Sequence, residues 1–278
     1  MTDVRHLVDA IAAVIPEVRE QFREARGKTA TENPSGDIQS SADRQIDRLF
    51  RDKLASLDAV GTFASEEREG VENVGEGFSV AIDPLDGSSN LQSNNIVGTV
   101  VGVYDAPLPA SGRDLVAGLF VLYGPFTTVT VAVDESVTRY VVDDGEIVDA
   151  NPVIIPDESD ICGFAGATNE WPKPVRECWD DLHRDYKLRY TGAMVADITH
   201  LLVNGGLLGY PERSSSPHGD LRLQYEANPI AYIVETAGGR SSTGRGSILD
   251  RSPEELHQHT PAYFGNAEQI DFLESTLS

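Results

Sequence analysis

The chain has 278 residues, of which 45 are acidic and 22 basic, so its formal net charge is −23. This charge repels nucleic acids and anionic membranes, and we expect the protein to bind neither. The acidic excess with few lysines favours adaptation to a cytosol of molar salt, where the Debye length falls to ~3 Å; an ordinary acidic protein is the alternative. Because no apolar run reaches the ~20 residues of a membrane span and no signal-peptide core opens the chain, we expect a cytoplasmic protein. Cys162 and Cys178 lack the spacing of a metal site and are expected to be reduced.

The first half of the chain changes from helical to strand periodicity near residue 60. Apolar residues recur at helical spacing over residues 3–26 and 41–57, and the polar stretch 27–40, which contains Gly and Pro, indicates a loop between two helices. Alternating and continuous apolar runs then predict strands at residues 60–65, 78–83, 97–104, 115–122, 127–133 and 138–142.

In the second half, helical patterns return at residues 175–184, 194–204 and 229–236. The last of these ends at Gly238 and Gly239, a helix stop that leads into a short strand. Ser252, followed by a proline and then Glu255, has the pattern of a helix start. The chain thus has helices first, then many strands, and then helices that alternate with strands. This order predicts layered α/β sheets in two fused halves, 1–155 and 156–278.

The strongest local motif is IDPLDGSSN, residues 82–90. Asp83 ends an apolar strand and Asp86 follows three residues later, so a turn fixed by Pro84 can direct both carboxylates toward one spot. The small residues after Asp86 leave backbone amides bare, and such amides bind phosphate oxygens. Carboxylates for a hard cation beside amides for a phosphate suit metal-assisted phosphoryl transfer, although an ordinary turn is the alternative for this motif alone.

Three further acidic elements are candidates for the same site. Glu66 and Glu67 follow a buried strand, where one can bind metal while the other orients a water, or both can belong to a solvated turn. Asp37 and Asp43 flank the start of the second helix, and Glu226 lies among apolar residues just before another. If these carboxylates share one pocket, their mutual repulsion requires bound cations.

These elements together resemble the class I fructose-1,6-bisphosphatases, within the wider family that includes the inositol monophosphatases. The resemblance extends from about Asn33 to the C-terminus, and its motifs are NPSGDIQ at 33–39, ASEE at 64–67, DPLDGSSN at 83–90, RYTGAMVAD at 189–197 and YEANPIAY at 225–232. It implies an α/β fold, the layered α-β-α-β-α sandwich of the sugar phosphatases. It also implies a homotetramer that acts on a sugar bisphosphate.

The resemblance further implies the metal and catalytic residues. Two or three Mg2+ ions, with Mn2+ as an alternative, would bind to four carboxylates and one backbone carbonyl: Glu66, Asp83, Asp86, Glu226 and the carbonyl of Leu85. Glu67 would act on the attacking water with help from Asp43, and Asp37 would assist when the loop at 27–40 closes. Water would attack in line, without a covalent intermediate.

It implies the substrate contacts as well. The amides of Gly87, Ser88 and Ser89 would hold the 1-phosphate. The sugar and its distal phosphate would contact Asn169, Tyr190 and Tyr210, and Arg189 would reach into the neighbouring subunit's site.

The chain departs from the family pattern at several positions. Asp220 stands where a lysine usually binds the distal phosphate, so we expect Asp220 to turn away and Arg213 or Arg222 to replace that lysine. Pro172 stands where some members have a phosphate-binding tyrosine. The N-terminus is short, and Gly77 and Phe78 replace a Lys-Tyr pair of the AMP site, which predicts no inhibition by AMP.

The leading hypothesis is hydrolysis of fructose 1,6-bisphosphate to fructose 6-phosphate, a step of gluconeogenesis. Because the residues expected to bind the distal phosphate differ from the family pattern, the alternative is hydrolysis by the same mechanism of sedoheptulose 1,7-bisphosphate or of an inositol or sugar monophosphate. A third hypothesis is a non-catalytic regulator that binds metal or sugar phosphate on the same fold. Binding without turnover would distinguish it.

Overall fold

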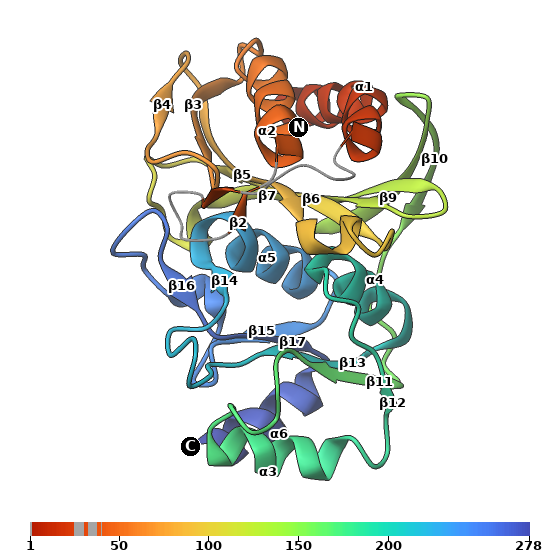
Figure 1. Ribbon diagram of the computed structural model, residues 1–278, viewed down its shortest axis with the longest axis vertical. Coiled ribbons are helices and arrows are strands. Elements are labelled where there is room, and N and C mark those ends of the chain that lie inside the picture. Colours follow the sequence, from red (N-terminus) through yellow and green to blue (C-terminus); the bar gives the residue numbers. More distant parts are fainter. Residues whose placement is uncertain (1, 25–30, 33–37, 40) are drawn as a thin grey trace.

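The computed structural model describes residues 2–24, 31–32, 38–39 and 41–278. Figure 1 shows helices and sheets stacked in alternating layers along the long axis: helices, a large sheet, helices, a smaller sheet and helices. The predicted α-β-α-β-α sandwich is therefore confirmed. Asp37 and most of the loop around it lie outside the described residues.

The outer layer at the N-terminal end consists of α1 (Thr2–Glu24) and α2 (Ser41–Leu54). The apolar residues of α1 recur at helical spacing, so Leu7, Ile11 and Val18 lie on one face and are buried. They belong to the same core cluster as Phe50 of α2 and the near face of the large sheet. Both helices were predicted from this spacing.

The large sheet has eight strands in the order β10-β9-β8-β7-β6-β5-β3-β4. Neighbouring strands are antiparallel except β3 and β5, which are parallel. The parallel pair brings the carboxyl ends of β3 and β5 to the same edge of the sheet. The strands are β3 (Val60–Ser65), β4 (Glu72–Asn73), β5 (Phe78–Asp86), β6 (Val97–Tyr104), β7 (Leu115–Tyr123), β8 (Thr127–Val133), β9 (Ser136–Asp143) and β10 (Glu146–Pro152).

The smaller sheet has five strands in the order β12-β11-β13-β17-β15. Its outer face is covered by α3 (Lys173–Leu182) and α6 (Ala267–Leu277), as Figure 1 shows. The strands are β11 (Ile161–Phe164), β12 (Lys187–Leu188), β13 (Gly206–Tyr210), β15 (Arg240–Ser242) and β17 (Ala262–Gly265). Two short pairs complete the described strands: β1 (Thr31–Glu32) with β2 (Ile38–Gln39), and β14 (Leu221–Arg222) with β16 (His259–Thr260).

The middle layer joins the two sheets. It contains α4 (Met194–Asn204) and α5 (Asn228–Thr236), and a π-helical turn, Leu223–Ala227, leads directly into α5. Val195, Ile230 and Ile233 are fully buried here, in a core cluster that also includes Phe120 of the large sheet and Phe264 of the smaller one. The middle layer therefore fixes the spacing of the two sheets, which is what positions the site described below.

Most predicted elements are present, but the helix expected at Ser252 is wrong. The segment from Ser252 forms bends and a turn. The Glu254 amide donates to the Gln258 side chain (2.6 Å) and the Gln258 amide donates to the Glu255 carbonyl, so the local bonds close a turn that enters β16. Cys162 and Cys178 are free and buried, as expected. None of the helices that the structure describes is both long and apolar enough to cross a membrane.

Candidate active site

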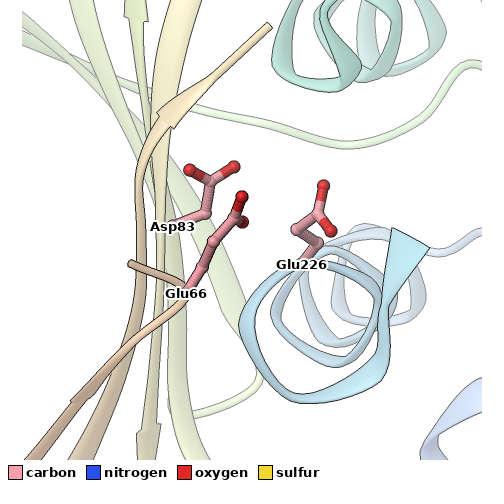
Figure 2. Close-up of side chains that lie close together, drawn as sticks. All are labelled: Glu66, Asp83 and Glu226. Atoms are coloured by element: carbon pink, nitrogen blue, oxygen red, sulfur yellow. The ribbon is translucent and has the colours of Figure 1, made fainter. Parts of the chain in front are cut away.

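Three carboxylates from distant parts of the chain converge between the large sheet and the middle layer. Glu66 follows the end of β3, Asp83 lies in β5, and Glu226 belongs to the π-helical turn before α5. One oxygen from each lies within 4.8 Å of the others. Figure 2 shows the carboxylates of Glu66 and Asp83 on the sheet side, facing that of Glu226 on the helical side.

The three carboxylates are withdrawn from solvent. Glu66, Asp83 and Glu226 are 9%, 3% and 6% exposed. Burial, together with repulsion from neighbouring carboxylates, raises the pKa of Glu66 and of Asp83 well above the ordinary values. Burial also raises the pKa of Glu226, although the Arg222 guanidinium opposes that shift. Such a group of buried acids is stabilised in its ionised form by a bound cation.

Arg222 supplies part of the positive charge at this site. Its Nη1 lies 3.4 Å from Glu66 and 3.5 Å from Glu226, and its backbone amide donates to Glu226 at 2.7 Å. One guanidinium does not balance three carboxylates. The oxygen donors fit a hard divalent cation such as Mg2+, which prefers carboxylate ligands.

Asp86 lies in the same region with a different set of contacts. Its two oxygens accept hydrogen bonds from the amides of Met194 (3.1 Å) and Val195 (2.8 Å), at the N-terminus of α4. Burial raises the pKa of Asp86 to about 7, and these amide bonds oppose the shift. The carboxylate therefore caps α4, and its predicted role as a metal ligand stays a prediction. The amide of Leu85 donates to Asp83 at 2.8 Å, which orients that carboxylate.

The loop that is predicted to bind phosphate follows Asp86. Gly87 has a left-handed φ of 71°, and a Cβ at this position would lie 2.5 Å from the Cβ of Ala193. Only glycine therefore fits here without strain. The next residues, Ser88–Leu91, form a short 3-10 helix. This loop packs directly against the turn before α4.

A cavity of about 480 Å³ joins the carboxylates to the loop and to the smaller sheet. The residues that line it come from both halves of the chain: Glu66, Asp83, Leu85, Asp86, Gly87, Ser88, Ser89, Ala165, Tyr190, Gly192, Met194, Tyr210, Asp220, Leu221, Arg222 and Glu226. Eleven of the residues predicted from sequence are among them. The cavity is therefore large enough for a small phosphorylated ligand.

The side of the cavity that is predicted to face the sugar carries Tyr190, Tyr210 and Asp220. Tyr190 is 54% exposed, whereas Tyr210 is buried and donates its hydroxyl hydrogen bond to Asp197 at 2.9 Å. Asp220 lines the cavity, so the expectation that it turns away is wrong. Its negative charge is instead balanced by Arg213, whose Nη2 donates to both oxygens, at 2.6 and 2.7 Å.

Other predicted residues lie outside the cavity lining that the structure describes. Asp43 is buried on α2, and Glu67 is half-buried, with its amide donating to Ser65 Oγ at 3.2 Å. Asn169 and Arg189 are exposed in loops. Their roles stay predictions. Asp197 was not predicted to have a role, although a lone acidic residue within an apolar helix is a visible signal for a buried polar contact.

Comparison with known proteins agrees with this geometry. The family model for the fructose-1,6-bisphosphatase N-terminal domain matches residues 1–149, and that for the C-terminal domain matches residues 155–278. The class 1 fructose-1,6-bisphosphatase of Halobacterium salinarum is 48% identical over 282 residues, which cover 100% of this chain and 98% of that protein. The one from Natronomonas pharaonis is 46% identical over 275 residues, covering 98% and 97%. The crystal structure of Leishmania major fructose-1,6-bisphosphatase in holo form matches with a TM-score of 0.93 and 31% identity, covering 99% of this chain and 94% of the other. The chain belongs to the class 1 fructose-1,6-bisphosphatase family.

Proposed function

We propose that this protein hydrolyses the 1-phosphate of fructose 1,6-bisphosphate, giving fructose 6-phosphate and phosphate, as a step of gluconeogenesis. The observation that carries the proposal is the position of three buried carboxylates in one cavity with the loop Gly87, Ser88 and Ser89. Metal-assisted phosphoryl transfer needs this pair of features. The relatives at 46–48% identity carry the name of the same activity.

We propose Mg2+ as the cation, with two or three ions per site and Mn2+ as an alternative. Glu66, Asp83 and Glu226 would hold it, with Asp86 and the carbonyl of Leu85 as further ligands. When bound, the metal supplies charge for the phosphoryl oxygens and lowers the pKa of a bound water. The carboxyl-only ligand set supports a hard cation over zinc, which favours nitrogen and sulfur.

The protein's own groups then bind and orient the reactants. Amides of Gly87, Ser88 and Ser89 hold the 1-phosphate, because a turn of glycine and serine presents its N–H groups with little side-chain obstruction. Glu67 directly follows the ligand Glu66, and we propose that it accepts the proton of the attacking water, with help from Asp43. Asp37 is proposed to assist in the same step.

For the distal phosphate, we propose Arg213 as the cation that replaces the family's lysine. Its guanidinium is held by Asp220 and, through Nη1, by Glu170 at 3.2 Å, so its position is fixed before a ligand arrives. Tyr190 lies near this group, since Arg213 and Asp220 both act on its pKa, which burial raises. Asn169 is proposed to complete this subsite, and Arg222 to contact the 1-phosphate side.

At the level of assembly, we propose a cytoplasmic homotetramer built from chains with halves 1–155 and 156–278. The strands of the large sheet precede this division and those of the smaller sheet follow it. Arg189 is exposed, and its neighbours Leu188 and Tyr190 are each 54% exposed, which supports an intersubunit role for this segment. Gel filtration in molar salt tests the oligomeric state.

The activity is tested by phosphate release in molar KCl, with magnesium or with EDTA. We expect magnesium-dependent release from fructose 1,6-bisphosphate and a loss of about 10²–10⁴ in kcat for Glu67→Gln. Glu69→Gln changes an exposed glutamate of the same turn and serves as the matched control. Faster release from sedoheptulose 1,7-bisphosphate or inositol 1-phosphate would overturn the substrate assignment. Binding without turnover would instead favour a regulator.

A further inference from the structure

Asp197, on α4, is a buried carboxylate outside the cavity lining that nevertheless contacts the cavity wall. The residue is 1% exposed. Its Oδ1 accepts hydrogen bonds from the amide (2.8 Å) and hydroxyl (2.9 Å) of Thr191, and its Oδ2 accepts one from the Tyr210 hydroxyl (2.9 Å). Burial raises the pKa of Asp197, and these three bonds oppose the shift. An acid this buried is costly unless donors surround it, so the contacts form a built arrangement.

Both hydrogen-bonding partners belong to the sugar-facing wall. Tyr210 ends β13 and lines the cavity. Thr191 lies between Tyr190 and Gly192, which also line the cavity. The Asp197 carboxylate therefore ties two separate pieces of the wall to one point on α4.

The same turn is also tied to the phosphate-binding loop. The side-chain amide of Asn90 donates to the Thr191 carbonyl at 3.0 Å and to the Ile96 carbonyl at 2.9 Å. Asn90 lies in the 3-10 helix that follows Gly87. A movement of the Thr191 turn would therefore be transmitted to the loop that is proposed to hold the 1-phosphate.

The first turn of α4 connects the metal side to the sugar side. The amides of Met194 and Val195 bind Asp86, at the end of β5, while Asp197, in the same helical turn, binds Thr191 and Tyr210. One rigid helical turn thus sets the relative position of the two ends of the cavity.

We propose that Asp197 is a positioning residue of this active site, which holds Tyr210 and the Tyr190–Gly192 turn at a fixed distance from the phosphate-binding loop. The inference rests on the proposed function, because it concerns how the sugar bisphosphate is bound. Asp197 acts through Thr191 and Tyr210 rather than through the ligand.

The test compares Asp197→Asn with the wild type. Asparagine keeps the shape and one acceptor oxygen, but places an NH2 group opposite a hydroxyl donor. Because hydrogen bonds to a charged group are among the stronger ones, we expect KM for fructose 1,6-bisphosphate to rise about tenfold, with kcat changed less than about threefold. Calorimetry in EDTA should show a similar loss of affinity for fructose 6-phosphate.

A matched control and a double-mutant cycle distinguish an effect on substrate binding from an effect on the stability of the fold. Glu235→Gln removes the charge of a carboxylate on α5 that accepts bonds from the hydroxyls of Ser241 and Ser247, away from the cavity lining. It should lower the melting temperature and leave KM unchanged. If Asp197 acts through Tyr210, the double variant Asp197→Asn/Tyr210→Phe should bind no more weakly than the worse of the two single variants.

An unchanged KM for Asp197→Asn with a lowered melting temperature would overturn the proposal, and so would full additivity with Tyr210→Phe. If Asp197→Asn does not fold, Thr191→Val keeps the shape but removes the hydroxyl, and with it the bond to Asp197 and the contacts to the Ala193 backbone. We expect KM to rise about threefold; no rise would again overturn the proposal. If the wild type does not turn over the bisphosphate, yet Asp197→Asn weakens fructose 6-phosphate binding, the proposed function fails and the positioning role stands.

Discussion

Replacing Asp83 by asparagine is expected to stabilise the metal-free protein and to destabilise it, relative to the wild type, in magnesium. The asparagine side chain keeps an oxygen that can accept the Leu85 amide, as Asp83 does at 2.8 Å, so the local turn is retained. The negative charge is removed from a group of three carboxylates. The same charge that is proposed to bind the metal therefore costs stability when the metal is absent.

The size of the effect follows from the spacing of the carboxylates. At 4.8 Å, two unit charges repel by about 3.5 kcal/mol at an effective dielectric constant of 20. Partial protonation of the wild-type carboxyls and the Arg222 guanidinium relieve part of this repulsion, and we expect a net gain of about 1–3 kcal/mol for Asp83→Asn in EDTA. The corresponding rise in melting temperature is roughly 2–5 °C for a protein of this size. Magnesium at about 1,000 times its Kd stabilises only the wild type, by about 4.1 kcal/mol, which exceeds the gain of the variant.

The same charges give the effect a pH dependence. Burial and repulsion raise the pKa of Glu66, Asp83 and Asp86 above their unfolded values, that of Asp86 to about 7. The folded, metal-free protein therefore binds more protons than the unfolded chain, and these groups lower its stability as the pH rises through that range. The advantage of Asp83→Asn should be largest above about pH 7 and should shrink toward about pH 5, where the wild-type carboxyls are protonated.

Thermal melts in molar KCl compare the melting temperatures of Asp83→Asn and the wild type, once with EDTA and once with magnesium. The matched control is Asp47→Asn, because Asp47 is similarly buried but accepts two hydrogen bonds from Arg68 Nε, at 2.9 and 3.2 Å. Loss of that ion pair should lower the melting temperature in both conditions. The reasoning is refuted if Asp83→Asn melts below the wild type in EDTA at pH 8, since the carboxylates would then not repel in the folded state.

Three further predictions concern the loop, the distal subsite and the thiols. Gly87→Ala should reduce kcat/KM by at least about tenfold and lower the melting temperature, because φ is 71° and the new Cβ would lie 2.5 Å from that of Ala193; steady-state kinetics and melts check both. Arg213→Met should raise KM for fructose 1,6-bisphosphate about tenfold while leaving release from a substrate without a distal phosphate unchanged, and equal losses on both substrates would contradict the role. Burial raises the pKa of Cys162 to about 11 and of Cys178 to about 12, so both thiols should react with iodoacetamide at pH 8 only after unfolding, as mass spectrometry of modified peptides would show.

The parts of the fold that the sequence predicts are those with a clear period. The apolar stripe of α4 and the continuous apolar run of β6 each predict one element, and the structure has both with the expected bounds. The strands β11 and β13 were not predicted, because they are short and contain glycine, so nothing in their own residues separates them from a loop. They form strands because they pair with each other in the middle of a sheet. Strand β10 is an exposed edge with no apolar alternation, and it too depends on its neighbour.

Some features of the candidate site could likewise be predicted from the sequence, and others could not. Glu66, Asp83 and Glu226 each carried a local signal, a carboxylate at the end of an apolar element, but their convergence depends on the packing of the middle layer against the large sheet. The pairing of Asp220 with Arg213 had no local signal, because the intervening loop sets it. The capping of α4 by Asp86 is a similar long-range contact. The sequence thus identifies the charged groups, whereas the packing decides which of them lie in contact.

The net charge of −23 and the charge at the cavity act over different distances. Repulsion between the acidic surface and a phosphorylated ligand is screened beyond ~10 Å at 0.1 M salt and beyond ~3 Å at molar salt. Of the residues that line the cavity, Arg222 lies against Glu66 and Glu226, and Asp220 is bound by Arg213 from outside the lining, at contact distances that salt screens far less. Carboxylates already form ion pairs with these guanidiniums. A phosphate or metal ion that enters the cavity would therefore compete with these ion pairs, and a phosphate would not find an unpaired arginine. We therefore expect the overall charge to affect the salt concentration at which the protein is stable, and the held arginines and buried carboxylates to decide which ligands it binds.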